Sequence, residues 1–99
     1  MPYDPFRMSW HVCFHKKAAK QLEAIPESIA QRLDALVQEI AVAGPLRGNW
    51  KNYGKLSATQ HHCHIKSGKP TYVVCWEVKD KTIKIVEVYY VGTHEKAPY

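Results

Sequence analysis

The sequence predicts an α+β fold in which a hairpin of two helices packs on a mainly antiparallel sheet. An alternating apolar segment lies near the N-terminus, and an amphipathic helical pattern follows it. Three β-like segments separated by turns occupy the second half. The expected order is therefore an N-terminal strand, the helix hairpin and three further strands. A chain of 99 residues is short, so we expect one domain over residues 1–99.

The first half of the chain is expected to contain one strand and both helices. Trp10, Val12 and Phe14 alternate and would share one face of a strand. Residues 15–24 read as a short helix, and Pro26 fits the first turn of the second helix, 26–42. The Gly-Pro pair at 44–45 ends this second helix. Its apolar stripe should pack on the sheet: Ile29, Leu33, Leu36, Val37 and Ile40.

The second half is expected to form a loop over 45–58 and then three strands. Segments 59–66 and 71–78 are joined by the turn sequence Ser67-Gly68-Lys69-Pro70. The final strand, 83–91, is apolar on both faces, with Ile83 and Ile85 on one face and Val86 and Val88 on the other. Such a strand is expected in the interior of the sheet.

Composition narrows the class of protein. No apolar run approaches the roughly 20 residues that span a bilayer, and residues 1–7 lack the apolar core of a signal peptide. We therefore expect a cytoplasmic protein without a membrane partner. Cys13, Cys63 and Cys75 form no CxxC pair and are expected to be reduced thiols. The net charge of +5 favours an anionic partner, although a basic surface can also serve solubility alone.

Histidines cluster on the first strand of the second half, at His61, His62 and His64. Neighbours on a strand face opposite sides, so only His62 and His64 share a face, with Cys63 opposite. A zinc site would need two or more further ligands, so we expect no metal and no cofactor. His61 and His62 are expected to be solvated on an edge strand.

His64 has a more specific interpretation together with His94, which follows the final strand after Gly92. If the two imidazoles approach each other, one can accept a proton while the other donates one, without a metal. RNA cleavage needs a base for the 2′-hydroxyl and an acid for the departing 5′-oxygen. The sequence leaves open which histidine takes which role. Tyr99 can fold back to stack on a base or to position the phosphate.

Cations must stabilise the charge that develops during such cleavage. We expect basic residues of the loop and turn, with one aromatic residue, to face the RNA: Arg47, Lys51, Lys69 and Tyr72.

Several short motifs resemble one known family. They are Trp10-x-Val12-x-Phe14 before a basic helix, Pro26 at the second helix, Pro45-Leu46-x-Gly48-x-Trp50-Lys51-x-Tyr53, Cys63-His64-Ile65 and Gly92-Thr93-His94. In this order they resemble the RelE/ParE toxin superfamily of bacterial toxin–antitoxin systems, and the last three look most like its YafQ-type branch. The resemblance covers nearly the whole chain.

The resemblance implies a RelE-like two-layer fold and a ribosome-dependent mRNA endonuclease that represses translation. It implies two partners: a cognate antitoxin and mRNA in the ribosomal A site. In the YafQ-like branch a strand histidine, a histidine after the final strand and a nearby aromatic take part in cleavage, matching His64, His94 and Tyr99. One departure is Gly44, where YafQ-like toxins carry a further histidine.

Two alternatives stay open at this point. One is a ParE-like inhibitor of DNA gyrase, which has no catalytic residues, and the other is a catalytically inactive protein-binding module. The pair of His64 and His94 favours the nuclease.

Overall fold

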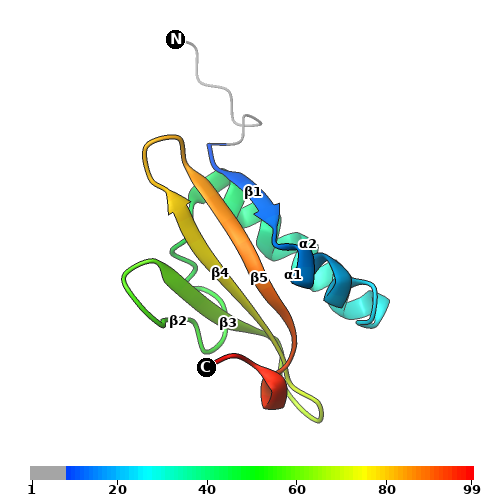
Figure 1. Cartoon of the computed structure of the whole chain (residues 1–99). Helices are drawn as coiled ribbons and strands as arrows, with labels where there is room; N and C mark the ends of the chain where they lie inside the picture. Colours follow the sequence, from blue (N-terminus) through cyan, green and yellow to red (C-terminus); the bar gives the residue numbers. More distant parts are fainter. Residues whose placement is uncertain (1–8) are drawn as a thin grey trace.

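An open sheet of five strands with two helices forms the protein in the computed structural model, which describes residues 9–99 (Figure 1). The α+β fold class is confirmed, with one strand more than expected. Residues 1–7, on which the argument against a signal peptide depends, lie outside the described residues. The elements are β1 (His11–Phe14), α1 (Lys16–Leu22), α2 (Glu27–Ala43), β2 (Gly54–Lys55), β3 (Gln60–Lys66), β4 (Tyr72–Asp80), β5 (Ile85–Thr93) and a 3₁₀ turn (His94–Lys96).

The strands follow the order β1-β5-β4-β3-β2 across the sheet. β1 pairs with β5 in parallel, and all the other pairs are antiparallel. β5 is an inner strand, as expected, and β4 takes the middle position. The additional strand, β2, arises within the segment expected to be a loop. It pairs Gly54 with His62 and Lys55 with His61, so β3 is not an edge strand.

The final strand begins two residues later than predicted, at Ile85. Ile83, which the sequence predicts on this strand, lies in the preceding turn and is 66% exposed. The cause is Asp80, whose carboxylate accepts hydrogen bonds from the backbone N–H groups of Thr82 and Ile83, at 2.8 and 3.0 Å. A side-chain acceptor of this kind stabilises a turn and withdraws the backbone from the sheet.

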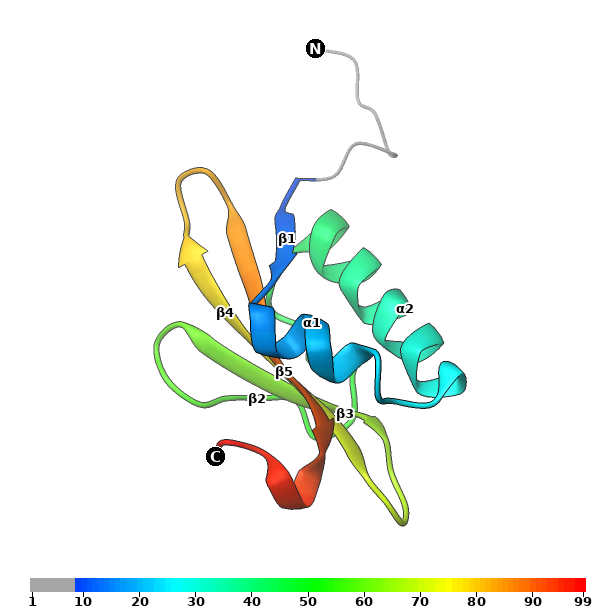
Figure 2. The same cartoon turned by 45° about the vertical axis from the view of Figure 1, so that its right-hand side comes forward.

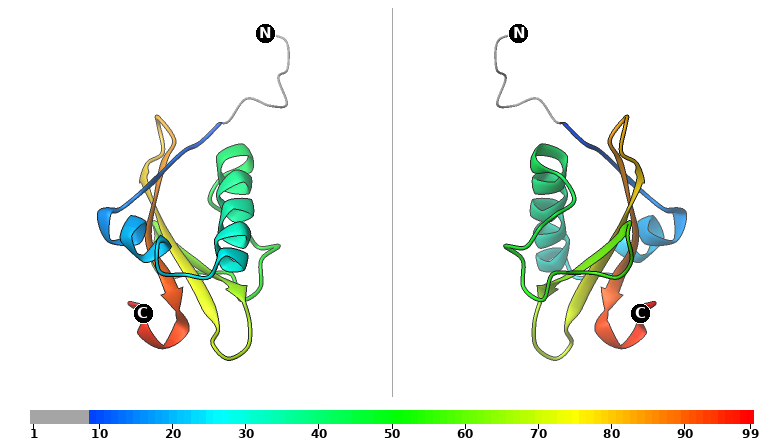
Figure 3. Two further views of the ribbon diagram at one scale, coloured as in Figure 1. Left: turned by 90° about the vertical axis from the view of Figure 1, so that its right-hand side faces the viewer. Right: turned by 90° about the vertical axis from the view of Figure 1, so that its left-hand side faces the viewer.

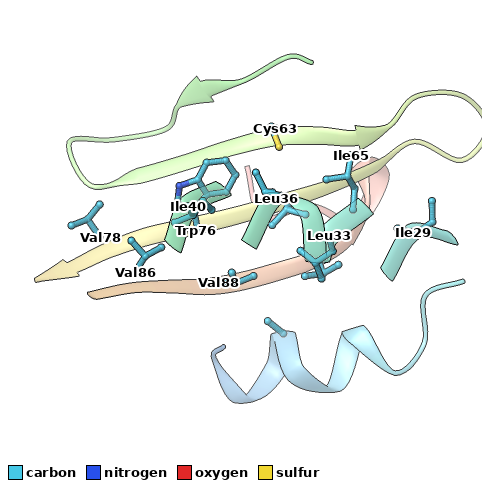
Figure 4. Close-up of a cluster of buried hydrophobic side chains, with 13 residues drawn as sticks. Ile29, Leu33, Leu36, Ile40, Cys63, Ile65, Trp76, Val78, Val86 and Val88 are labelled. Atoms are coloured by element: carbon cyan, nitrogen blue, oxygen red, sulfur yellow. The ribbon is translucent and has the colours of Figure 1, made fainter. Parts of the chain in front are cut away.

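The helix α2 packs its apolar stripe against the strands in the main core, as the periodicity predicts (Figures 2 and 4). Its start is one residue later than expected, because Pro26 is the N-cap and its carbonyl accepts from Ile29 and Ala30. At the other end Gly44, with φ of 99°, terminates the helix. Four of the five predicted stripe residues are buried, and Val37 is half-buried against the same core. The buried four are Ile29, Leu33, Leu36 and Ile40.

One face of the sheet packs against α2, while α1 lies beside β5 and adds to the same core (Figure 4). Ala18 of α1 and the buried residues of α2 belong to one cluster with Trp76, Val86 and Val88. Cys63 lies in this cluster, whereas Cys75 is buried on the opposite face, and both are free thiols whose pKa burial raises to about 12. Within residues 9–99, neither helix is long and apolar enough to cross a membrane.

The opposite face of the sheet is covered by the C-terminal segment, which turns back across it on the side away from α2 (Figure 3). A second, smaller cluster anchors the segment there, with Ala97 packed against Val73, Cys75 and Tyr90. The Tyr90 hydroxyl also donates to the carbonyl of Thr93 at 2.7 Å. This fold-back brings residues 94–99 over β3 and β4.

Candidate functional site

The alternation of β3 determines which histidines can form a site. Its burial alternates at every residue, so His62 and His64 lie on the face away from the helices. His94 begins the 3₁₀ turn directly after β5, and its backbone N–H donates to the carbonyl of Thr71 at 2.8 Å. Both His64 and His94 are therefore attached to backbone that the sheet holds in place.

The structure brings together the three residues that the sequence selected for catalysis. The ring centroids of His64 and His94 are 5.5 Å apart, with an interplanar angle of 64°. Tyr99 lies edge-on to His94 at 6.0 Å and is 47% exposed. Two imidazoles this close can each contact one oxygen of the same phosphodiester, which is the geometry that paired acid and base catalysis needs.

His62 is a fourth member of this cluster, and the sequence analysis missed it. Its ring lies 4.6 Å from that of Tyr99, tilted by 38°, and the residue is only half-buried rather than fully solvated. The signal was present in the sequence, because the same alternation that selects His64 also selects His62. The expectation of an edge strand concealed it.

His61 is a core residue, which corrects the prediction that it is solvated. It is 2% exposed, stacks on Trp76 at 5.8 Å and shares a 2.8 Å hydrogen bond with the Tyr53 hydroxyl. The alternation of β3 puts His61 on the same face as Cys63 and Ile65, where Tyr53 and Trp76 cover it. Burial, together with the charge of Lys55, holds its pKa below 6.5.

The electrostatics of the cluster favour the neutral forms of His62 and His64. Burial lowers the pKa of His64 below 6.5, and repulsion from His94 and Lys51 lowers it further. The pKa of His62 is lowered by burial first and then by His64 and His94. A neutral imidazole can accept a proton, so His64 is suited to act as a base. Burial also raises the pKa of the Tyr99 phenol, which therefore keeps its proton.

Two of the predicted RNA-facing cations border the histidine cluster. The carbonyl of Lys51 accepts the backbone N–H of His64 at 2.8 Å, and the side chain of this lysine is exposed. Lys69 lines a hollow with Thr71, Thr93 and His94. Lys51 thus adjoins His64, and Lys69 adjoins His94.

Arg47 is placed differently from the prediction. It forms an ion pair with Glu39 at 3.1 Å, and its side chain is only 16% exposed. The same carboxylate oxygen accepts hydrogen bonds from Asn49 and Trp50, at 2.8 and 3.0 Å. Arg47 therefore holds the 45–53 loop on α2, and its charge is already neutralised.

Tyr72 also lies away from the site. It packs against the helix-side core, on the opposite face of the sheet from His64. The alternation of β4 causes this, because Tyr72 shares a face with Val74 and Trp76. Among residues 9–99, no group of three or more His, Cys, Asp and Glu side chains is placed to hold a metal ion.

Comparison of the whole structure with solved structures identifies the architecture. No protein-family profile and no curated protein sequence matches the chain. The free E. coli toxin RelE, in a mutant with two arginines replaced by alanine, superposes with a TM-score of 0.69 at 18% identity. The match covers 91% of this chain and 88% of that one. A chain of the intact E. coli RelBE toxin-antitoxin complex gives 0.64 at 21% identity, with coverage of 88% and 99%. A chain of the archaeal RelE-RelB complex from Pyrococcus horikoshii OT3 gives 0.59 at 15% identity, with coverage of 91% and 100%.

The chain has the RelE fold. The expected RelE-like arrangement, with a helix hairpin on a mainly antiparallel sheet, is thereby confirmed. The likeness to the YafQ-type branch stays a prediction that rests on the motifs around His64 and His94. In this RelE fold the four-residue cluster of His62, His64, His94 and Tyr99, called the histidine site below, occupies the sheet face opposite α2.

Proposed function

We propose that the protein is the toxin of a bacterial type II toxin–antitoxin system and cleaves mRNA in the ribosomal A site. The observation that carries this proposal is the 5.5 Å separation of the His64 and His94 rings on one exposed sheet face. The RelE fold adds support, because the matched structures are of RelE toxins and toxin–antitoxin complexes. A gyrase inhibitor or a passive binding module would have no need for two adjoining imidazoles.

In the proposed reaction His64 acts as general base and His94 as general acid. Neutral His64 takes the proton of the 2′-hydroxyl, and the 2′-oxygen attacks the adjacent phosphorus. The bond to the 5′-oxygen breaks, and His94, in its imidazolium form, donates a proton to that oxygen. The products are a 2′,3′-cyclic phosphate and a 5′-hydroxyl end. The lowered pKa of His64 supports its assignment as the base.

The other residues of the site bind and orient the RNA. Lys51 and Lys69 border the imidazoles and stabilise the negative charge that builds up on phosphorus. Tyr99, half-exposed beside His94, offers a ring on which a nucleobase can stack. Arg47 and Tyr72 have no role in this scheme, because one is paired with Glu39 and the other packs on the helix side.

A cognate antitoxin is the second proposed partner. The net charge of +5 matches an acidic segment, and a chain that folds on binding can cover both the lysines and the C-terminal segment. Such coverage would block the histidine site. The proposed site of action is the cytoplasm, where translating ribosomes are present.

The test is cleavage of a reporter mRNA on purified translating ribosomes. His64→Ala and His94→Ala should each lower the cleavage rate by about 10²–10⁴-fold, the usual cost of losing one partner of an acid/base pair. His11→Ala is the matched control, because His11 is exposed on β1 at the far edge of the sheet. Circular dichroism checks that each variant is folded. No cleavage by the wild type, or full cleavage by both site variants, would overturn the proposal.

A further inference from the structure

We propose that His62 is a positioning residue that holds the ring of Tyr99 at the paired imidazoles. This inference rests on the proposed function, since it assigns a role to a residue that the cleavage scheme leaves unused. The ring of His62 is the nearer of the two imidazoles to Tyr99, at 4.6 Å compared with 6.0 Å for His94.

Tyr99 depends on this contact for its position. The C-terminal segment is anchored as far as Ala97, which packs on the second apolar cluster and donates its N–H to the His94 carbonyl at 3.2 Å. Two residues later, the aromatic contacts that the structure gives Tyr99 are those with His62 and His94. A tyrosine must lose rotamer freedom to meet a substrate, and a ring against which it rests reduces that cost.

The surroundings of His62 suit support rather than proton transfer. Its Nδ1 atom is buried and has no hydrogen-bond partner among the residues that the structure describes. Its Nε2 atom faces Gly54, the residue directly opposite His62 in the pairing of β2 with β3. Nδ1 is thus withdrawn from the open face of the site, Nε2 lies over Gly54, and the ring meets Tyr99.

Gly54 makes room for this arrangement. A Cβ atom added at Gly54 would lie 3.2 Å from Nε2 of His62, a separation at which the imidazole must shift. β2 and the C-terminal segment therefore enclose the His62 ring between them. Gly54→Ala should displace the ring towards Tyr99 without removing any group of the histidine site.

The first arm of the experiment is NMR spectroscopy of the full chain, which needs no activity. The wild type should show an NOE between the ring protons of residue 62 and those of Tyr99. In His62→Ala the Tyr99 ring signals should move towards random-coil shifts, in Gly54→Ala they should shift, and in His62→Phe the NOE should persist. Unchanged Tyr99 signals in His62→Ala would overturn the inference, and the signals of core residues report folding in the same spectra.

The second arm measures mRNA cleavage in a double-mutant cycle. His62→Ala should lower kcat/KM by about 2- to 10-fold, the worth of one aromatic pair, and His62→Phe should restore most of this loss. In a Tyr99→Ala background, His62→Ala should have no further effect. Equal losses in His62→Phe and His62→Ala, or additive losses with Tyr99→Ala, would overturn the positioning role. A wild type that cleaves no mRNA refutes the proposed function, while the NMR arm still decides whether His62 holds Tyr99.

Discussion

Replacement of His61 by alanine should destabilise the fold strongly while leaving the histidine site chemically intact. His61 is 2% exposed and contacts Tyr53 and Trp76 beneath the helices. Its neighbour His62 lies on the other face of β3. Substitution of His61 is therefore expected to lower stability, whereas substitution of its neighbour His62 is expected to lower activity.

The magnitude follows from the contacts that are lost. Without His61 the half-buried Tyr53 hydroxyl has no partner, which costs about 1–3 kcal/mol. Loss of the parallel stack on Trp76, at 5.8 Å and 6°, adds about 0.5–1.5 kcal/mol. The free energy of unfolding should fall by about 2–4 kcal/mol. This is a large share of the total, because native domains are typically stable by only about 5–15 kcal/mol. For a chain of this length, the midpoint of thermal unfolding should fall by roughly 10–30 °C.

Urea unfolding followed by circular dichroism gives the comparison, with His11→Ala as the control. Because the pKa of folded His61 lies below its usual 6.5, its contribution to stability is present above pH 6.5 and is lost as the pH falls through the folded pKa. The difference in the free energy of unfolding between wild type and His61→Ala should therefore become smaller as the pH is lowered from 7 to about 5. A His61→Ala variant within about 0.5 kcal/mol of the wild type at pH 7 would refute the burial argument.

Two further predictions concern the loop and the lysines. Burial alone would raise the pKa of Glu39, but hydrogen bonds from Asn49, Trp50 and Arg47 and the charge of Arg47 bring it below 4.5. Glu39→Gln should therefore lower stability by about 1–2 kcal/mol at pH 7, with the loss vanishing as the pH falls through the folded pKa; an unchanged urea midpoint at pH 7 would contradict this. For binding of single-stranded RNA, the logarithm of the association constant falls linearly with the logarithm of the salt concentration. Lys51→Gln and Lys69→Gln should each make this slope less steep by about 0.7, and Lys20→Gln should leave it unchanged. Equal slopes in all three variants would place the RNA elsewhere.

The sequence predicts those features that depend on periodicity. The helical spacing of Ile29, Leu33, Leu36 and Ile40 identifies the buried face of α2, because the apolar stripe continues over several turns of the helix. Strand alternation likewise places His64 on an open face. The periodicity does not show that His64 and His94 meet. Their strands, β3 and β5, are separated by β4 in the sheet, so the contact depends on the strand order.

Short elements and contacts between distant residues escape such reasoning. The strand β2 has two residues, too few for any pattern, yet it turns β3 into an inner strand, and the preceding loop residue Tyr53 covers His61. Arg47 looks like a free cation in the sequence, because nothing in the spacing shows that Glu39 of the preceding helix α2 neutralises it. The return of Tyr99 to His62 depends on the packing of the C-terminal segment and not on local propensity.

The central claim is that His94 donates the proton to the departing 5′-oxygen while His64 removes the 2′ proton. An RNA with sulfur in place of the bridging 5′-oxygen at the cleavage site tests it most directly, because a thiolate leaves without protonation. On this substrate His94→Ala should recover cleavage to within about tenfold of the wild type, whereas His64→Ala should stay at least about 10²-fold slower. Recovery of His64→Ala, or failure of sulfur to rescue His94→Ala, would contradict the assignment.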